Sequence, residues 1–186
     1  MPMPAASPGP ATVWTVGHSS RSLETFLEIL AAHHVEAIAD VRRFPGSRRY
    51  PWFASEALAA ELPRHAIEYQ WLPQLGGRRR VQPGSPNGGW RNVSFQGYAD
   101  HLSSEEFADG LARALALAAR RRTALMCAEA LWWQCHRALI SDVLKFHGCE
   151  VVHILDATKT APHAYSAPAR VDHGRLEYPP VQGALL

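Results

Sequence analysis

Two cysteines, a glutamate, a histidine and an arginine lie close together in this sequence, as Cys127 and Glu129 and then as Cys135, His136 and Arg137. Such residue types act as thiolate nucleophiles, metal ligands or polar binding groups. Cys135 is expected at the N-terminus of a helix, where backbone N–H groups lower a thiol pKa and attract anions.

Three interpretations of this cluster stay open. Cys127, Cys135 and His136 could bind a metal ion, although their spacing matches no zinc ribbon and no fourth ligand is evident, so we predict no metal. Either cysteine could be a thiolate nucleophile. In the third interpretation the thiols are buried, and Glu129, His136 and Arg137 contact a ligand.

Two more polar clusters are expected at strand ends. His18 and Ser19 follow a short β-branched strand, where a histidine is a donor, an acid, a metal ligand or a buried ring satisfied by the backbone. Asp40 and Arg42 share one face of a strand because side chains alternate. They form either a structural ion pair or a ligand-binding pair, in which Asp40 activates water or stabilises a cation and Arg42 holds an anion.

Arginines interleave with aromatic residues over 42–53 and 71–91. This pattern suits phosphates and stacked bases, while an arginine-rich composition alone is equally typical of a GC-rich genome. The formal charge of +2 is too small to indicate nucleic-acid binding by itself. We predict nucleic-acid contacts from Arg48, Arg78, Arg79, Arg80 and Arg91 and substrate stacking on Tyr50 and Trp52, with 76–89 as a long functional loop.

Strand-like and helix-like segments must position these residues, and they alternate along the chain. Strands are predicted at 12–16, 36–41, 67–72, 123–127 and 150–155. Helices are predicted at 23–34, 55–62, 103–118 and 135–147. Ser103 and Glu106 form a predicted capping box at the start of the third helix. This order predicts a single three-layer α/β domain, with a mostly parallel sheet of about five strands and helices on both faces. Ligands bind such sheets at the carboxyl ends of strands, so we expect His18, Asp40 and Glu129 to line one pocket.

The composition sets the class of protein. With 186 residues, 47% hydrophobic and 19% charged, the chain is long and apolar enough for one folded domain, which excludes global disorder, coiled coil and collagen. No apolar run is long enough for a membrane span, and the uncharged, proline-rich start lacks the apolar core of a signal peptide. Three cysteines cannot all pair, so a reduced, cytoplasmic protein is expected. The predicted boundaries are a disordered tail at 1–11, the α/β domain at 12–156 and an irregular tail at 157–186.

Five separated motifs resemble those of the DUF488 family. They are the sequences TVGHS at 15–19, DVR at 40–42, LGGR at 75–78, FQGYA at 95–99, and Cys127 with Glu129 followed by Cys135, His136 and Arg137. They match in order from about residue 13 to 156. The resemblance implies DNA repair by excision of modified pyrimidine bases. This chain departs from the family in the aromatic turn at 131–134.

The leading hypothesis is a monofunctional DNA glycosylase that hydrolyses the N-glycosidic bond of a modified or damaged pyrimidine of the uracil type. Asp40 is the first choice for the catalytic carboxylate and Glu129 the second, with His18 or Arg137 stabilising the departing base. Further substrate contacts are expected from Ser19, Arg42, Cys127, Cys135 and His136. DNA is the expected partner, no cofactor is expected, and the oligomeric state stays open. The alternatives are a thiol-dependent small-molecule enzyme using Cys135 or Cys127 and a non-catalytic nucleotide-binding module.

Overall fold

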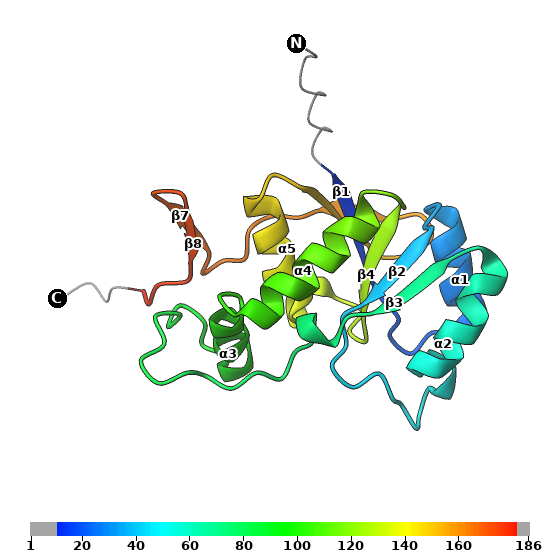
Figure 1. The fold of residues 1–186 in the computed structure, drawn as a ribbon, viewed down its shortest axis with the longest axis horizontal. Coiled ribbons are helices and arrows are strands. Elements are labelled where there is room, and N and C mark those ends of the chain that lie inside the picture. The colour runs from blue at the N-terminus through cyan, green and yellow to red at the C-terminus, as the bar shows by residue number, and fades with distance from the viewer. Residues whose placement is uncertain (1–10, 182–186) are drawn as a thin grey trace, which may run out of the picture.

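The main structural element is a six-stranded sheet with the order β3-β2-β4-β1-β5-β6, seen in a computed structural model that describes residues 11–181 (Figure 1). Strands β1 to β5 are parallel and β6 runs antiparallel to β5 at one edge. This confirms the predicted mostly parallel α/β domain. The strands are β1 (Thr12–Gly17), β2 (Ala37–Asp40), β3 (Glu68–Trp71), β4 (Thr123–Cys127), β5 (Glu150–Ile154) and β6 (Thr160–Pro162).

Helices cover both faces of this sheet. One apolar cluster joins α1 (Leu23–Ala32) and α2 (Ser55–Glu61) to side chains such as Ile38 and Met126. The other joins α3 (Val93–His101), α4 (Glu105–Ala118) and α5 (Arg137–Phe146) to side chains such as Leu125. Because both faces are covered, every residue of β2 and β4 is buried. Short 3₁₀ turns lie at Pro51–Phe53, Leu62–His65, Pro73–Leu75 and Trp132–Gln134.

Helix α3 and the start of α4 differ from the sequence expectation. Helix α3 was not predicted, because its residues form no apolar stripe; instead its Gly97 packs on the carbonyl of Arg79, where a Cβ would lie 2.3 Å from that oxygen. The predicted capping box of Ser103 and Glu106 does not form; the helix is capped by Ser104 instead, and Glu106 binds Arg79. Ser104 Oγ accepts from the Phe107 amide, whereas Ser103 Oγ donates to the Asp100 carbonyl.

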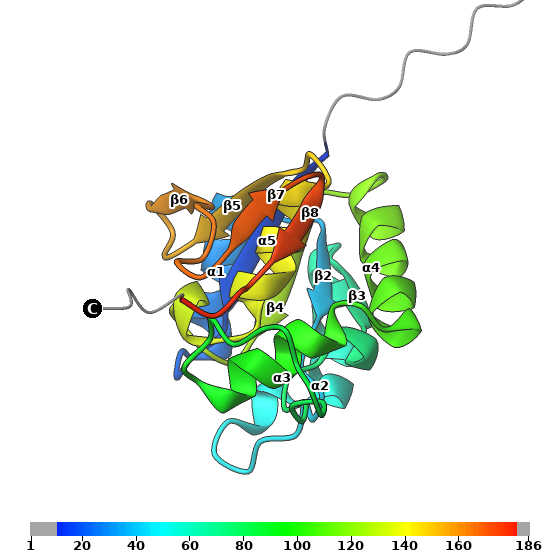
Figure 2. The same ribbon diagram turned by 90° about the vertical axis from the view of Figure 1, so that its left-hand side faces the viewer.

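The segment after residue 156 carries more regular structure than the irregular tail that was predicted. Strand β6 adds to the sheet, and β7 (Arg170–Asp172) pairs with β8 (Arg175–Glu177) in a hairpin in front of α5 (Figure 2). Buried polar contacts rather than an apolar period hold this segment, since His163 and Tyr178 both bind Asp142 of α5. The predicted N-terminal tail lies outside the described residues, except for its last residue.

The chain leaves the neighbouring strands β1 and β4 in opposite directions across the sheet, through α1 toward β2 and through α5 toward β5. Open α/β sheets bind ligands at such a switch. Gly17 at the end of β1 pairs with Cys127, and a Cβ at Gly17 would lie 1.8 Å from the carbonyl oxygen of Glu129. Glycine is therefore required for β1 and the β4 loop to meet here.

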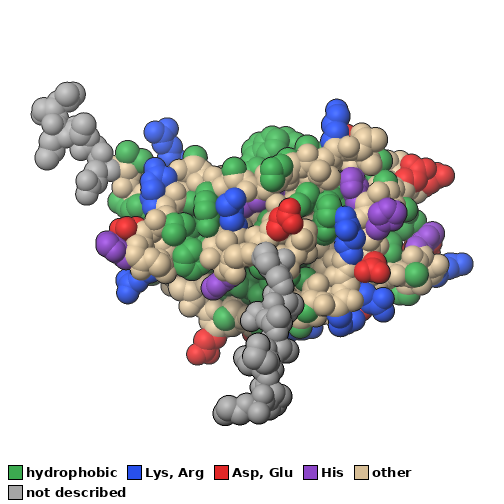
Figure 3. Space-filling model, turned by 90° about the horizontal axis from the view of Figure 1, so that it is seen from above, with side chains coloured by type: hydrophobic (Ala, Val, Ile, Leu, Met, Phe, Trp, Pro, Cys, Tyr) green, Lys and Arg blue, Asp and Glu red, His purple; other side chains and the backbone are tan. Residues whose placement is uncertain are grey.

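The surface is mixed in charge on the side shown in Figure 3. Basic and acidic side chains are interspersed there, with no single-sign patch. Among the helices of the described residues, none has the length and apolar character needed to cross a membrane.

Candidate functional site

A cavity of about 430 Å³ lies at the carboxyl edge of the sheet. Its walls come from the residues after β2, the residues after β4, the start of α5, the loop after β3 and the start of α3. The lining residues are Arg42, Arg43, Phe44, Gly77, Arg78, Asn92, Ser94, Phe95, Tyr98, Cys127, Ala128, Glu129, Gln134, Cys135 and His136.

The cavity brings together several of the residues expected from the sequence: Arg42, Arg78, Cys127, Glu129, Cys135 and His136 line it. Of the three side chains expected to share one pocket, only Glu129 lines the cavity. His18 and Asp40 lie behind Arg42, which connects both of them to it.

Asp40 is fully buried, and its carboxylate is occupied by other groups. Oδ1 accepts from Arg42 Nε at 2.8 Å and Oδ2 from Arg42 Nη2 at 2.5 Å, and the Tyr69 hydroxyl donates to Oδ2 at 2.7 Å. Although burial opposes the charged form, Asp40 raises the pKa of Arg42 above its ordinary value. Of the two interpretations of this pair, the ion pair is the one observed, and Asp40 is a positioning residue that aims Arg42 at the cavity.

His18 has no free ring nitrogen. Its Nδ1–H donates to the Ser19 carbonyl at 2.8 Å, and Nε2 accepts from Arg42 Nη1 at 3.2 Å. An arginine only donates, so Nε2 carries no proton and the ring is neutral. Burial lowers the pKa of His18 to about 4, and the ring stacks on Phe53 at 4.2 Å. The expectation that His18 stabilises a departing base is therefore not met by this geometry.

The two thiols of the cluster touch each other, with 3.1 Å between Cys127 Sγ and Cys135 Sγ. Arg137 Nε donates to Cys135 Sγ at 3.2 Å. Burial opposes ionisation of Cys135, but the Cys127 thiol and the Arg137 charge hold its pKa well below the ordinary value. The contact with Cys135, followed by burial, raises the pKa of Cys127. Of the two thiols, Cys135 is therefore the one that ionises more readily.

Arg137 lies behind the thiols and does not line the cavity. It is 1% exposed and donates to Cys135, to Thr15 Oγ1 and to the backbone oxygens of Glu129 and Ala130. It therefore cannot contact a departing base as expected, and it acts on Cys135 instead.

Glu129 is the carboxylate that the structure leaves available. Its backbone oxygen is held by Arg137 Nη2, while its exposed side chain makes no hydrogen bond or ion pair with any described residue. The backbone is held in place and the carboxylate has no partner among the described residues, so it is available to a ligand in the cavity.

His136 presents one ring nitrogen to the cavity. Its Nε2–H donates to the Val41 carbonyl at 2.8 Å, and burial lowers its pKa, so the ring is neutral. No described residue bonds Nδ1. A Cβ at Gly77 would lie 3.1 Å from Nδ1, so the glycine leaves room at this nitrogen.

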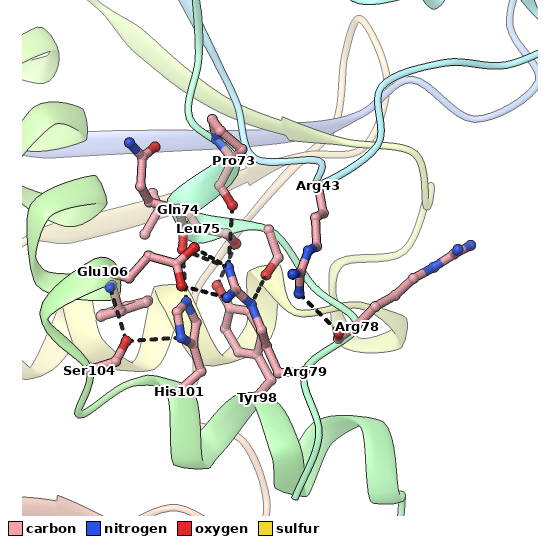
Figure 4. A network of polar contacts seen from close by, with 12 residues as sticks. Arg43, Pro73, Gln74, Leu75, Arg78, Arg79, Tyr98, His101, Ser104 and Glu106 are labelled. Carbon is pink, nitrogen blue, oxygen red and sulfur yellow. Dashed lines mark hydrogen bonds and ion pairs between the residues drawn. The ribbon is translucent and has the colours of Figure 1, made fainter.

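The arginines after β3 divide into different roles (Figure 4). Arg79 points inward: it bonds both carboxylate oxygens of Glu106, at 2.7 and 2.9 Å, and the carbonyls of Pro73, Gln74 and Gly76. Arg78 instead extends away from this network and lines the cavity. Arg79 is thus a structural residue that anchors the loop, in contrast to the predicted nucleic-acid contact.

An exposed ring marks the mouth of the cavity. Phe44 is 65% exposed, and the guanidinium carbons of Arg43 and Arg78 lie 5.6 and 5.9 Å from the centre of its ring. Arg43 Nη1 also donates to the Arg78 carbonyl at 3.3 Å. This combination of a ring and two cations can stack a planar group and hold an anion.

The remaining predicted residues lie outside the cavity lining. Tyr50 and Trp52 pack near Phe53, and Trp52 Nε1 donates to the Arg21 carbonyl at 3.1 Å. Ser19 supplies its carbonyl to His18. Arg48, Arg80 and Arg91 are exposed.

Four lining residues were not predicted from the sequence as part of the site: Arg43, Phe44, Phe95 and Tyr98. Phe44 and Arg43 follow β2 directly, so their place after a buried strand was an available signal. Phe95 and Tyr98 could be assigned to the site only if α3 was recognised as a helix. In the aromatic turn Trp132 stacks on His153 at 4.2 Å and only Gln134 lines the cavity.

No group of three or more histidine, cysteine or acidic side chains within the described part of the chain is arranged to hold a metal ion. Comparison with known proteins finds no match among curated proteins and none among solved structures. It finds one family, a domain of unknown function named DUF488, which matches residues 22–144 and so covers both β2 and the Cys127–Arg137 segment. The chain belongs to the DUF488 family.

Proposed function

We propose that the protein is a monofunctional DNA glycosylase and that the cavity receives a modified or damaged pyrimidine nucleotide extruded from DNA. The observation that carries the proposal is the free carboxylate of Glu129 in a cavity of about 430 Å³ whose mouth has Arg43, Arg78 and Phe44. That volume is in the range of pockets for small ligands.

In this proposal Glu129 replaces Asp40 as the catalytic carboxylate. Cleavage of the glycosidic bond builds positive charge on the sugar, which a carboxylate in the cavity stabilises while it orients the attacking water. Asp40 cannot do so, because all of its bonds go to Arg42 and Tyr69.

Arg42 is the group best placed to stabilise the departing base. A guanidinium has five N–H donors, of which Asp40 and His18 engage three in Arg42. The others are available at the cavity, where they can donate to the anionic oxygen or nitrogen of the base. Asn92 adds a donor, since its Oδ1 caps α3 and leaves its Nδ2 amide free of partners among the described residues.

Hydrolysis fits this cavity better than Schiff-base chemistry, because no lysine lines it. Lys145 Nζ donates to the His163 carbonyl at 2.9 Å, and Lys159 lies after β5.

The test is a set of oligonucleotides that carry uracil, 5-hydroxymethyluracil, a thymine mismatch or an alkylated base, assayed for abasic sites with wild type and Glu129→Gln. We expect excision of one of the uracil-type bases and its loss in the variant, with Glu28→Gln on α1 as the control. Tight binding of DNA without release of any base would instead identify a binding module.

A further inference from the structure

The two thiols at the cavity floor have no part in the proposed excision. We propose that they form a thiol–disulfide exchange centre, in which Cys135 attacks a carboxylate-bearing low-molecular-weight disulfide entering the cavity and Cys127 completes the exchange. This activity is independent of the glycosylase proposal, and its test measures thiols only.

The geometry suits an internal disulfide. The sulfur atoms are 3.1 Å apart, and a disulfide needs about 2.05 Å, so about one ångström of movement closes the bond. Cys127 ends β4, and Cys135 caps the end of the 3₁₀ turn Trp132–Gln134, two residues before α5, so separate elements hold the two cysteines. Both residues line the cavity, which gives a reagent access to them.

The charge on Arg137 identifies Cys135 as the attacking group. A buried cation is costly unless an anion neutralises it. Among the described residues no carboxylate bonds Arg137, and of the groups that do, only Cys135 can carry a negative charge. The thiolate is the nucleophilic form of cysteine, and the guanidinium holds Cys135 in it.

A chain of hydrogen bonds supports Arg137 from the opposite side. Thr15 Oγ1 accepts from Arg137, so its proton goes to His153 Nδ1 at 2.7 Å. His153 Nε2 then donates to His163 Nδ1 at 2.9 Å, and His163 Nε2 donates to Asp142 at 2.8 Å.

Every donor in this chain has an acceptor, and burial lowers the pKa of His153 far below its ordinary value. The chain ends on the buried carboxylate of Asp142, which also accepts from the Tyr178 hydroxyl at 3.0 Å. The C-terminal segment thereby orients Thr15 to accept from Arg137, which fixes the guanidinium against Cys135.

The exchange balances as follows. The Cys135 thiolate attacks one sulfur of the disulfide RSSR, forms the mixed disulfide Cys135–S–SR and expels RS⁻, which takes the Cys127 proton as RSH. The Cys127 thiolate then attacks Cys135 Sγ and expels a second RS⁻, which is protonated by water. The protein loses two electrons and RSSR gains them.

The same arginine determines the direction of equilibrium. Forming the internal disulfide removes the negative charge beside Arg137 and leaves that cation buried without a neutralising partner. The reduced pair is therefore stabilised and the disulfide is a good oxidant, as in oxidoreductases whose reduced form is stabilised. Arg42, Arg43 and Arg78 at the cavity favour an anionic disulfide over a neutral one.

The experiment uses the full chain, reduced and then incubated with glutathione disulfide, quenched in acid, labelled with N-ethylmaleimide under denaturing conditions and weighed intact. We expect wild type to lose two labelled thiols and keep one, on Cys149. Cys149→Ser should likewise lose two, Cys127→Ser should stop as a mixed disulfide on Cys135, and Cys135→Ser should not react at this pair. With neutral hydroxyethyl disulfide we expect a rate several-fold lower.

Substitution of Arg137 tests the effect of its charge on the thiol–disulfide equilibrium. Arg137→Gln should shift the equilibrium with glutathione at least 10-fold toward the disulfide, since the thiolate loses its partner. If Arg137→Gln does not fold, Arg137→Lys should shift it in the same direction by less. A wild-type protein that keeps three free thiols, that accumulates a stable mixed disulfide, or whose equilibrium is unchanged in the folded arginine variant would overturn the proposal.

Discussion

Two buried arginines serve this site, and they are neutralised in different ways. Arg42 pairs with the carboxylate of Asp40, while Arg137 faces the sulfur of Cys135. The carboxylate of Asp40 accepts four hydrogen bonds, two on each oxygen, so it has no lone pair aimed at a ligand and the first pair is a rigid support for Arg42. A thiolate is a nucleophile, so the second pair carries reactivity. A buried arginine thus stabilises the structure in the first pair, whereas in the second pair it activates a nucleophile.

The largest effect is expected where the first pair is broken. Asp40→Asn leaves Arg42 buried without a negative charge, which should lower the free energy of unfolding by about 3–5 kcal/mol. Urea denaturation measures this, with Asp109→Asn on the exposed face of α4 as the control. If the Asp40→Asn protein is stable but its excision activity is strongly reduced, Asp40 takes part in catalysis.

Glu129 provides the contrast, because it is a carboxylate without partners. Glu129→Gln should reduce single-turnover excision about 10²-fold or more, through loss of the electrostatic and general-base contributions, and leave stability unchanged. The measurement is release of base from the preferred oligonucleotide, combined with a melting curve. Equal losses of stability and excision would show that Glu129 supports the fold instead.

Because neutral His18 accepts a hydrogen bond from Arg42, the free energy of unfolding should depend on pH. The pKa of His18 is lowered to about 4 from 6.5, so the folded protein binds its proton less readily than the unfolded chain does. The stability contributed by neutral His18 is complete above pH 6.5 and is lost as the pH falls toward 4, by about 2–3 kcal/mol. His18→Gln should flatten the fall in unfolding free energy between these pH values. An unchanged slope would contradict the neutral ring.

The reactive pair predicts a different titration. In Cys149→Ser, alkylation by iodoacetamide should follow a thiolate whose pKa is well below the ordinary value, because Arg137 stabilises it. In Cys127→Ser/Cys135→Ser the remaining thiol, Cys149, should react only at higher pH, since burial raises its pKa. If alkylation of the two variants had the same pH dependence, Arg137 would not activate a thiol, and its role would not differ from the supporting role of Arg42.

The sequence predicted the elements of the sheet better than the connections between chemical groups. Strand β4 was predicted at its observed bounds, because a fully apolar run between a helix and a polar turn has few alternatives. Asp40, Arg42 and Glu129 were placed correctly at strand ends. Which carboxylate was free could not be predicted, because it depends on Tyr69, a residue of the neighbouring strand that reaches across to Asp40.

Tertiary contacts explain the other differences. Helix α3 has a glycine at its centre and no apolar stripe. The Tyr98 hydroxyl ties it to the Leu75 carbonyl, and Gly97 lets the Arg79 carbonyl approach the helix closely. The chain from Thr15 to Asp142 joins residues from β1, β5, α5 and the C-terminal segment. Histidines that lie far apart in a sequence give no indication that they will be hydrogen-bonded to each other.

The smallest expected effect separates two neighbouring arginines of one loop. Arg78 faces the cavity and has no hydrogen bond from its side chain to a described residue, whereas Arg79 binds Glu106 and three backbone carbonyls. Arg78→Gln should weaken DNA binding uniformly across sequences and reduce the slope of log affinity against log salt by about one unit, with no loss of stability. Arg79→Gln should leave that slope unchanged and cost about 1–2 kcal/mol of unfolding free energy, because the ion pair with Glu106 is lost and the Gly76 carbonyl loses its donor. Fluorescence anisotropy at several salt concentrations and a urea titration of each variant measure both quantities. If both variants change the salt slope equally, the loop contacts phosphates as a unit, and the division between an outward and an inward arginine is wrong.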